Sequence, residues 1–332
     1  MKKLHNCKKI QKIVVIRTDR IGEVLLSTPV IEALHKRFKD AKIDFVTSPY
    51  SADIVSDRID INKVILFDTF SKRLPVWNAI SLANKLRPKS FDMAVILNPH
   101  KILHLGCFLA GIPIRVGFKR KWPFLLTHKI EDNRDEAKMH EVEYNLELLR
   151  IIDIYTDKLY PFMPVLSNSG SEVDGLLNKV GIKPHGRIVA IHPGSSNKKK
   201  QWGIDNFKKV VKSLSEEGKM DVAIIGDKSE KELGSKISAG MGENVHDLTG
   251  IFTIKQLAAF LKKTGILITN DNGPMHIAAA VGTRIIALFN KDVAGSNPVR
   301  WGPCGDGHTI FYEDFDKIKP EEIIEAVNTV LQ

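Results

Sequence analysis

The stretch ILITNDNGPMHIAAAVG, from Ile266 to Gly282, decides the fold of the second half of the chain. Its apolar start, residues 266–269, predicts a buried strand, and the polar residues 270–273 predict a tight turn. Pro274 suits the first position of a helix, because the N–H group that it lacks would have no partner there. A strand that leads through a glycine-containing turn into a helix is how α/β proteins bind phosphate groups. This stretch therefore predicts an anion site.

Apolar strands and amphipathic helices alternate through almost the whole chain, which predicts an α/β fold with parallel sheets covered on both faces. In the first half we expect strands at residues 12–17, 42–48, 63–68, 92–98 and 114–118, and helices at 24–38, 76–86 and 140–152. In the second half we expect strands at 187–194, 221–226, 265–271 and 284–289, and helices at 205–215, 229–237, 254–263 and from Pro320 onward.

A length of 332 residues favours two domains. The segment LYPFMPVLSNSGS is rich in Pro, Gly and Ser, which is typical of a linker. We expect an N-terminal domain at residues 1–160, a linker at 161–171 and a C-terminal domain at 172–332, whose last helix is a candidate to pack back on the first domain. Two such doubly wound domains would leave a cleft between the carboxyl ends of their strands, where open α/β sheets bind ligands.

The composition is typical of a soluble globular enzyme, with 43% hydrophobic and 27% charged residues. No apolar run approaches the roughly 18 residues that a membrane span needs. The basic first residues lack the apolar core of a signal peptide, and three scattered cysteines show no metal-ligand spacing. These features favour a cytoplasmic location.

The chain carries 49 Lys and Arg against 39 Asp and Glu, a net charge of +10. Such a charge favours an anionic partner, which is a nucleic acid, a phosphorylated substrate or a membrane surface. The basic residues are concentrated locally, for example in FKRKW at residues 118–122 and NKKKQW at residues 197–202. The alternative for each of these clusters is that it is an ordinary solvated surface. No zinc finger, RNA-binding aromatic signature or long basic helix is present, so nucleic acid is not favoured.

The segment RTDRIGEVLLSTP, residues 17–29, follows the first predicted strand. It lacks the G-x-G-x-x-G pattern of dinucleotide-binding proteins. It places the carboxylates of Asp19 and Glu23 at a strand-to-helix turn, where one of them could take a proton from a hydroxyl group. The alternative is that Glu23 only complements the dipole of its helix.

The segment IHPGSSNKKKQW, residues 191–202, follows a strand of the second half. Gly194, Ser195 and Ser196 offer backbone donors and two hydroxyls, and Lys200 adds a positive charge. Turns rich in converging N–H groups bind anions, so this set suits a diphosphate as well as it suits an ordinary turn. The spacing of a Walker loop is absent, and Trp202 is expected to anchor the loop by packing.

The segment IIGDKSEKE places acidic side chains shortly after a strand. Glu230 or Asp227 could bind ribose hydroxyls, as acidic residues do in nucleotide-binding folds. The alternative is helix capping by Asp227 or Ser229. Taken alone, His192 and His276 are interpreted as structural histidines and not as catalytic residues. Taken together, the segments predict one site that holds a diphosphate between two loops and a ribose beside them.

The segments RTDRIGEVLLSTP, HPGSS with a later K-x-W, LTG before a helix, and NDNGPMHIAAAVG occur in the order seen in the lipopolysaccharide heptosyltransferases, glycosyltransferase family 9. The chain resembles that family over nearly its whole length, and HEVEYNLELL is similar to a further segment of it. The resemblance implies a GT-B fold of two Rossmann-like domains facing each other across a cleft. It also implies an inverting, metal-independent and cofactor-free transfer of L-glycero-D-manno-heptose from an ADP-activated donor to the inner core of lipopolysaccharide.

The resemblance implies roles for single residues. It places the catalytic carboxylate on Glu23, where the family usually has Asp. Because Glu is one methylene longer, either the acceptor sits slightly differently or the role of base is weakened or shared with Asp19. The donor residues that it implies are Ser195, Ser196 and Lys200 for the diphosphate, Glu230 for the ribose, and Asp271, Asn272 and Gly273 for the sugar and phosphate, with His276 nearby.

Lys119, Arg120 and Lys121 lie in the acceptor half of the chain. We expect them to contact the phosphates of a lipid A/Kdo or inner-core acceptor, or the inner membrane surface, on whose cytoplasmic face the enzyme would be peripheral. The alternatives are a GT-B glycosyltransferase with another nucleotide sugar and glycan, and a non-catalytic nucleotide-sugar-binding protein. A NAD-dependent dehydrogenase is disfavoured because the glycine fingerprint is absent.

Overall fold

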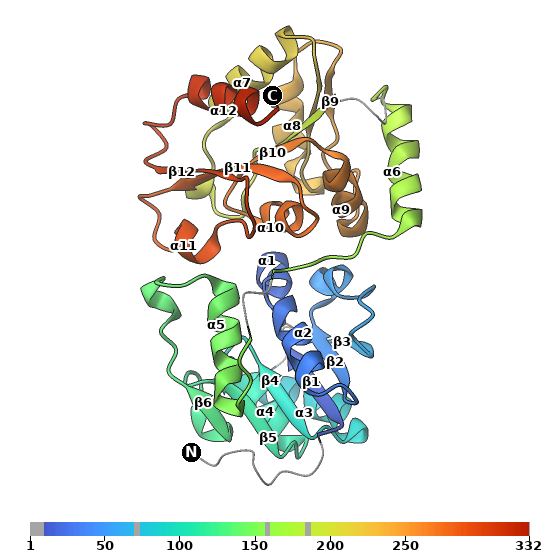
Figure 1. Ribbon diagram of the computed structural model, residues 1–332, viewed down its shortest axis with the longest axis vertical. Coiled ribbons are helices and arrows are strands. Elements are labelled where there is room, and N and C mark those ends of the chain that lie inside the picture. Colours follow the sequence, from blue (N-terminus) through green and yellow to red (C-terminus); the bar gives the residue numbers. More distant parts are fainter. Residues whose placement is uncertain (1–9, 70–73, 157–159, 183–186, 332) are drawn as a thin grey trace. The chain divides into compact units, whose positions relative to one another are not determined.

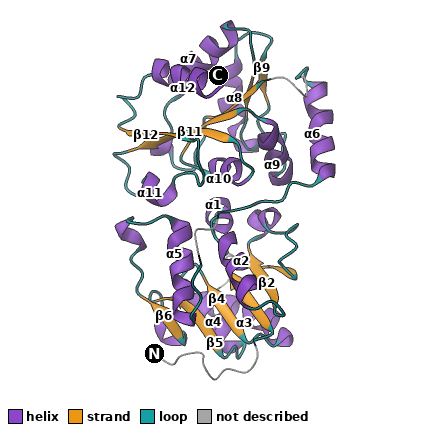
Figure 2. Ribbon diagram, in the orientation of Figure 1, coloured by secondary structure: helices purple, strands orange, loops and turns teal. Residues whose placement is uncertain are grey.

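The computed structural model describes residues 10–69, 74–156, 160–182 and 187–331 (Figure 1). The basic N-terminal residues 1–9 lie outside the described part. The chain divides into two compact units, Met1–Phe162 and Met163–Gln332. Each unit is a parallel sheet with helices on both faces (Figure 2). No helix among the described residues has the length and apolar character that crossing a membrane requires.

The sheet of the first unit has six parallel strands in the order β3-β2-β1-β4-β5-β6, the doubly wound order of Rossmann folds. The strands are β1 Lys12–Ile16, β2 Lys42–Thr47, β3 Lys63–Leu66, β4 Met93–Ile96, β5 Ile114–Phe118 and β6 His128–Ile130. The helices are α1 Ile21–Leu25, α2 Thr28–Arg37, α3 Pro75–Leu86, α4 Lys101–Leu109 and α5 Glu141–Glu147, with short 3₁₀ turns η2 Pro49–Ile54, η3 Arg87–Lys89, η4 Pro123–Leu125, η5 Arg134–Glu136 and η6 Leu148–Ile152.

The two faces of this sheet are covered by different helices, because right-handed crossovers place α1 and α2 on one face and α3, α4 and η4 on the other. Buried Leu82 of α3 and Leu103 of α4 pack on Ile16 and Ile96 of the central strands. On the opposite face α2 packs against α5. We refer below to the outer surface of α3, α4 and η4 as the α3/α4/η4 face.

The single helix predicted at residues 24–38 is wrong, since the structure has two helices, α1 and α2, separated at Leu26 and Ser27. Pro29 cannot donate a backbone hydrogen bond, so the ladder is interrupted there. Side chains compensate: Thr28 Oγ1 donates to the carbonyl of Leu25 at 2.8 Å, and Ser27 Oγ donates to the carbonyl of Glu23 at 2.7 Å.

The sheet of the second unit repeats this topology, with six parallel strands in the order β12-β11-β10-β7-β8-β9. The strands are β7 Ile188–His192, β8 Asp221–Ile224, β9 Val245–Asp247, β10 Ile266–Asn270, β11 Arg284–Asn290 and β12 Thr309–Glu313. The helices are α6 Ser167–Lys179, α7 Ile204–Glu216, α8 Lys231–Ser238, α9 Ile254–Lys263, α10 Gly273–Ala280, α11 Pro298–Trp301 and α12 Pro320–Leu331, with 3₁₀ turns η7 Lys198–Lys200 and η8 Lys228–Glu230. The predicted α/β class with two Rossmann-like units is confirmed.

The end of the predicted linker is helical, because α6 begins at Ser167. Its Gly and Ser residues suggested a linker, but Val173 and Leu177 are buried on one side of the helix. Polar contacts also hold α6 on α9, where Lys263 pairs with Asp174 at 3.0 Å. Tertiary packing therefore overrides the weak local propensity of this segment.

The last helix, α12, buries its apolar face within the second unit. Ile323 and Val327 are fully buried in the same core cluster as Phe207 and Val210 of α7. These side chains make α12 part of the core that covers one face of the second sheet.

Candidate active site

The three predicted donor segments lie at one edge of the second sheet. Strands β10, β7 and β8 are neighbours there, with Thr269 opposite His192 and Ile191 opposite Ile224. Because the strands are parallel, the segments that follow them all leave from the same edge. This is the edge at which open α/β sheets bind ligands.

A chain of hydrogen bonds joins the three segments through His192, a buried residue that the sequence suggested was only structural. His192 Nδ1 lies 2.7 Å from Asn272 Nδ2, and His192 Nε2 lies 3.2 Å from Glu230 Oε2. Asn272 Nδ2 also donates to the carbonyl of Gly194 at 2.9 Å. One histidine therefore sets the positions of two predicted donor residues, Glu230 and Asn272.

The surrounding bonds fix the orientation of the Asn272 amide. Its Oδ1 accepts from the backbone N–H of Met275 at 3.3 Å and from Thr269 Oγ1 at 3.1 Å, so its nitrogen faces His192. His192 Nδ1 must then accept and Nε2 must carry the proton that is donated to Glu230. Asn272 also caps the N-terminus of α10, in which Pro274 takes the second position and Gly273 the first.

Glu230 occupies space that only glycine leaves open. A Cβ atom at Gly194 would lie 1.5 Å from Glu230 Oε1, and one at Gly226 would lie 2.7 Å from Oε2. Burial raises the pKa of Glu230, but the hydrogen bonds from His192 and from the backbone N–H of Asp227, 2.9 Å away, outweigh it and hold the pKa below its usual value. The site thus presents an ionised carboxylate, which is suited to accept hydrogen bonds from ribose hydroxyls.

Replacing Gly194 with Ala is expected to displace Glu230. If Glu230 has the ribose role expected from the sequence, binding of ADP as a probe should weaken by about 10- to 100-fold, the cost of losing hydrogen bonds to a charged group. Titration calorimetry with ADP measures the effect. Gly175→Ala is the matched control, because nothing lies within 4 Å of a Cβ there and the position is helical. Equal ADP affinity in Gly194→Ala and Gly175→Ala would remove Glu230 from the nucleotide site.

Lys200 and Asp271 form an ion pair at the same edge, with 2.5 Å between Nζ and Oδ2. Ser296 Oγ donates to the same oxygen at 3.2 Å, and Asp271 is buried. The pair holds the ammonium group of Lys200 beside the N-terminal end of α10, whose helix dipole also favours an anion. His276 of α10 is buried, Ser195 is half-buried and Ser196 is exposed.

The loop that carries Lys200 is anchored by Trp202, as the sequence predicted. The Trp202 ring is buried edge-on against Phe207, with 5.2 Å between ring centroids, and Nε1 donates to the carbonyl of Ile318 at 3.3 Å. Asn270 ties the two ends of the loop together: its Oδ1 accepts from the N–H of Trp202 at 3.1 Å and its Nδ2 donates to the carbonyl of Pro193 at 2.7 Å. The loop is thereby held in place before any ligand binds.

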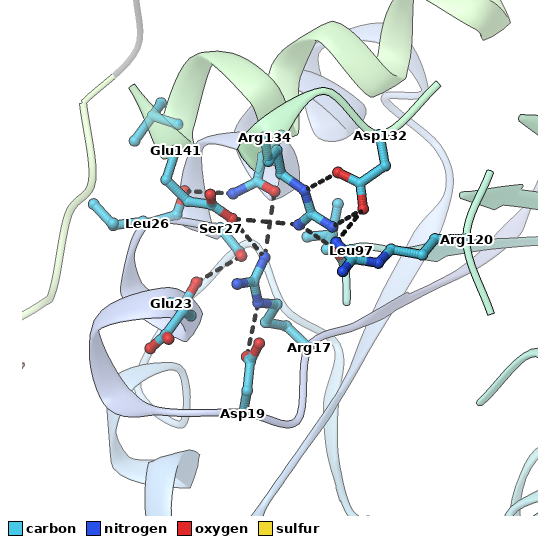
Figure 3. A network of polar contacts seen from close by, with 12 residues as sticks. Arg17, Asp19, Glu23, Leu26, Ser27, Leu97, Arg120, Asp132, Arg134 and Glu141 are labelled. Carbon is cyan, nitrogen blue, oxygen red and sulfur yellow. Dashed lines mark hydrogen bonds and ion pairs between the residues drawn. The ribbon is translucent and has the colours of Figure 1, made fainter. Parts of the chain in front are cut away.

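In the first unit, a buried network of charges surrounds the end of β1 (Figure 3). Arg17 pairs with Asp19 at 2.7 Å and with Glu141 at 3.1 Å. Glu141 lies 3.5 Å from Arg134, which in turn forms a two-bond pair with Asp132 at 2.7 and 2.9 Å. The sequence indicated only Asp19 of this set, because the partners of Arg17 and Arg134 are brought together by the sheet order.

The structure separates the two candidate bases of the first unit. Asp19 is committed to the guanidinium of Arg17. The carboxylate of Glu23 is half-buried and carries no dashed line in Figure 3, where only its backbone carbonyl accepts a bond, from Ser27. Burial, followed by the nearby charge of Asp19, raises the pKa of Glu23 above its usual value despite Arg17. A carboxylate without a cationic hydrogen-bond partner and with a raised pKa is the better proton acceptor.

The three basic residues predicted to bind acceptor phosphates do not act as one cluster. Lys119 pairs with Glu131 at 2.5 Å, and Arg120 pairs with Asp135 at 3.2 Å. Lys121 is exposed and has a left-handed backbone with φ of 54°. Among the described residues, no group of three or more His, Cys, Asp or Glu side chains is placed to hold a metal ion.

Comparison with known proteins identifies the family of the chain. Residues 79–327 match the family model of glycosyltransferase family 9 (heptosyltransferase). Lipopolysaccharide heptosyltransferase 2 of Escherichia coli K12 is 24% identical over 346 residues, covering 96% of this chain and 98% of that protein. Lipopolysaccharide heptosyltransferase 3 of Escherichia coli K12 is 28% identical over 299 residues, covering 85% and 82%.

The fold of the whole chain is also that of a solved heptosyltransferase. The structure of Escherichia coli ADP-heptose lps heptosyltransferase II superposes with a TM-score of 0.83 at 23% identity, over 97% of this chain and 98% of that one. The likeness confirms the GT-B class for the two Rossmann-like units. By its family match and its fold, the chain belongs to glycosyltransferase family 9, the heptosyltransferases, and is a glycosyltransferase.

Proposed function

We propose that this enzyme transfers a heptose from ADP-L-glycero-D-manno-heptose to a hydroxyl group of the lipopolysaccharide inner core, on a lipid A/Kdo or a larger acceptor. The observation that carries the donor assignment is the hydrogen-bonded set Glu230, His192 and Asn272 beside the Lys200–Asp271 pair. It offers an ionised carboxylate for a ribose and a cation with a helix N-terminus for a diphosphate.

The proposed reaction is an in-line displacement with inversion. Glu23 takes the proton of the acceptor hydroxyl, whose oxygen attacks the anomeric carbon of the donor while the bond from that carbon to the diphosphate breaks. The leaving diphosphate is stabilised by Lys200 and by the dipole of α10, without a metal ion. Ser195 and Ser196 donate hydrogen bonds to the diphosphate, and Asp271 and Gly273, with His276 nearby, contact the sugar and phosphate.

The remaining assignments concern the acceptor and the location. Lys119, Arg120 and Lys121 are proposed to meet the acceptor phosphates, with Lys121 the main contact because the other two pair with carboxylates. The enzyme is proposed to work in the cytoplasm on the inner face of the inner membrane, where it would need no cofactor.

A nucleotide screen tests the donor assignment. ADP and ADP-heptose are expected to raise the melting temperature, because a ligand at 100 times its Kd stabilises a protein by about 2.7 kcal/mol. UDP and GDP serve as matched controls with the same diphosphate. Stabilisation by UDP-sugars or GDP-sugars alone would instead identify a GT-B enzyme with another donor. Binding of ADP-heptose without transfer to any inner-core acceptor would indicate a non-catalytic binder.

A further inference from the structure

The entire net charge of the chain lies in residues 69–130. This segment has eleven Lys and Arg and one acidic residue, Asp92, which is a net +10; the rest of the chain has 38 basic and 38 acidic residues. The carboxylate of Asp92 accepts hydrogen bonds from the backbone N–H groups of Gln11 and Lys12, at 2.8 and 2.9 Å. This carboxylate therefore binds backbone N–H groups at the amino end of β1.

The fold places several of the described lysines of this segment on one side of the first unit. Its described residues form α3, η3, β4, α4, β5, η4 and β6, and four exposed lysines lie on or beside the α3/α4/η4 face. They are Lys85 on α3, Lys101 on α4, and Lys121 and Lys129 on either side of η4. No Asp or Glu occurs between residues 93 and 130, and the carboxylates that follow pair with Lys119 and Arg120.

Large aromatic side chains are exposed among these lysines. Trp77 is 59% exposed on α3, Phe108 is 49% exposed on α4, and Trp122 and Phe124 are 40% and 71% exposed at η4. The ammonium group of Lys101 lies 5.3 Å from the centre of the Trp122 ring, which lies 6.3 Å from that of Phe124. Exposed apolar groups gathered on one face mark an interaction surface.

The backbone that leads into the aromatic pair at η4 is unusual and is tied to α4. Lys121 and Trp122 both adopt left-handed backbone angles, with φ of 54° and 65°. Buried His104 of α4 forms a hydrogen bond through Nδ1 with the carbonyl of Lys121 at 2.8 Å. Backbone strain of this kind persists only where the surroundings enforce it, and it is concentrated at functional sites.

We propose that the α3/α4/η4 face docks on an anionic phospholipid bilayer, with Trp77, Trp122 and Phe124 among the headgroups and Lys85 and Lys101 against lipid phosphates. Tryptophan is enriched at the interface between membrane and water, and basic side chains are attracted to anionic lipid surfaces. The rings lie on separate elements of one helical face, which suits a flat surface.

The docking rests on the proposed function in one respect. The acceptor proposed above is anchored to a lipid and is therefore confined to a membrane surface. Lys101 and Trp122 closely follow the carboxyl ends of β4 and β5, and Trp77 lies in the first turn of α3, the helix after β3. Asp19 and Glu23 follow β1 at the same edge of the sheet. Docking would therefore bring the acceptor hydroxyls to the edge that carries the base.

Co-sedimentation with vesicles tests the proposal. The full chain is expected to bind vesicles of phosphatidylcholine mixed with phosphatidylglycerol and not phosphatidylcholine alone. Lys85→Glu with Lys101→Glu should weaken binding at least about tenfold, since each basic residue near the surface contributes a factor of about five. Trp122→Ser with Phe124→Ser, made separately, should also weaken binding, because it removes the rings proposed to lie among the headgroups. Lys36→Glu with Lys39→Glu makes the same charge change on the opposite face and should leave binding within about twofold.

Two further measurements make each outcome decisive. Stabilisation by ADP in every variant shows that the fold and the donor site are intact. Quenching of wild-type fluorescence by brominated phospholipids should fall in Trp122→Phe. Equal loss of vesicle binding in the Lys36/Lys39 control, or capture of an acidic protein without any binding to anionic vesicles, would overturn the docking. Vesicle binding without stabilisation by any ADP compound would overturn the proposed donor and leave the docking standing.

Discussion

Glu23→Gln is expected to lower kcat for heptose transfer by about 10²- to 10⁴-fold, the usual contribution of a general base. Binding of ADP-heptose should be unchanged, because the proposed donor residues belong to the second unit. Single-turnover transfer to an inner-core acceptor, with calorimetry of ADP-heptose binding, measures both quantities. Glu23→Asp is the conservative control, since it keeps a carboxylate and should retain more activity than Gln. Equal rates in Glu23→Gln and the wild type would remove Glu23 from the chemistry.

The raised pKa of Glu23 also gives this substitution a stability signature. A carboxyl group whose pKa is higher in the folded than in the unfolded state binds more protons when folded, so its contribution to stability falls as the pH rises through that range. Glu23→Gln should therefore melt no lower than the wild type at neutral pH. The wild-type kcat/KM should fall toward acid with an apparent pKa above that of an ordinary glutamate. If Glu23 had only a structural role, Glu23→Gln would instead melt at a lower temperature than the wild type.

Glu141→Ala is expected to destabilise the first unit by about 3–5 kcal/mol, the cost of removing one partner from a buried ion pair. Glu141 is fully buried between Arg17 and Arg134, so both guanidinium groups would lose a desolvated counter-charge. Urea unfolding measures the change. Glu147→Ala, in the same helix, removes the exposed pair with Arg150 and should cost less than about 1 kcal/mol. Equal losses of unfolding free energy in Glu141→Ala and Glu147→Ala would mean that the buried network stabilises the unit no more than an exposed ion pair does.

The same substitution is expected to lower activity indirectly. Arg17 donates to Asp19 as well as to Glu141, and its charge opposes the rise in the pKa of Glu23. Glu141 is thus a positioning residue, and its removal should shift the acidic limb of the pH profile. If Glu141 had a purely structural role, Glu141→Ala would lower the free energy of unfolding without shifting the acidic limb of the pH profile.

The fold could be predicted from the sequence where local pattern and tertiary environment agree. Strands such as β1 and β10 are buried along most of their length, so their apolar runs are unmistakable. Strands β6 and β9 were not predicted, because each has three residues, and HKI and VHD carry no apolar run. Strand β12 lies at an edge, where alternate residues are exposed and the pattern is weak.

The site could be predicted only in part, because a single sequence shows which residues follow strands and not which of them meet. The placement of Glu230 and Asp271 at strand ends follows from the pattern. The bridging role of His192 depends on β7 lying between β8 and β10, which is a property of the sheet order. The contact between Arg17 and Glu141 spans 124 positions, and nothing local announces it.

The close contact between Gly194 and Glu230 also limits which substitutions this protein can accept during evolution. A side chain at position 194 would push the carboxylate of Glu230 out of its present place. A lineage that acquires a larger residue at 194 therefore moves or loses the ionised group at that place. We expect changes at the two positions to be coupled.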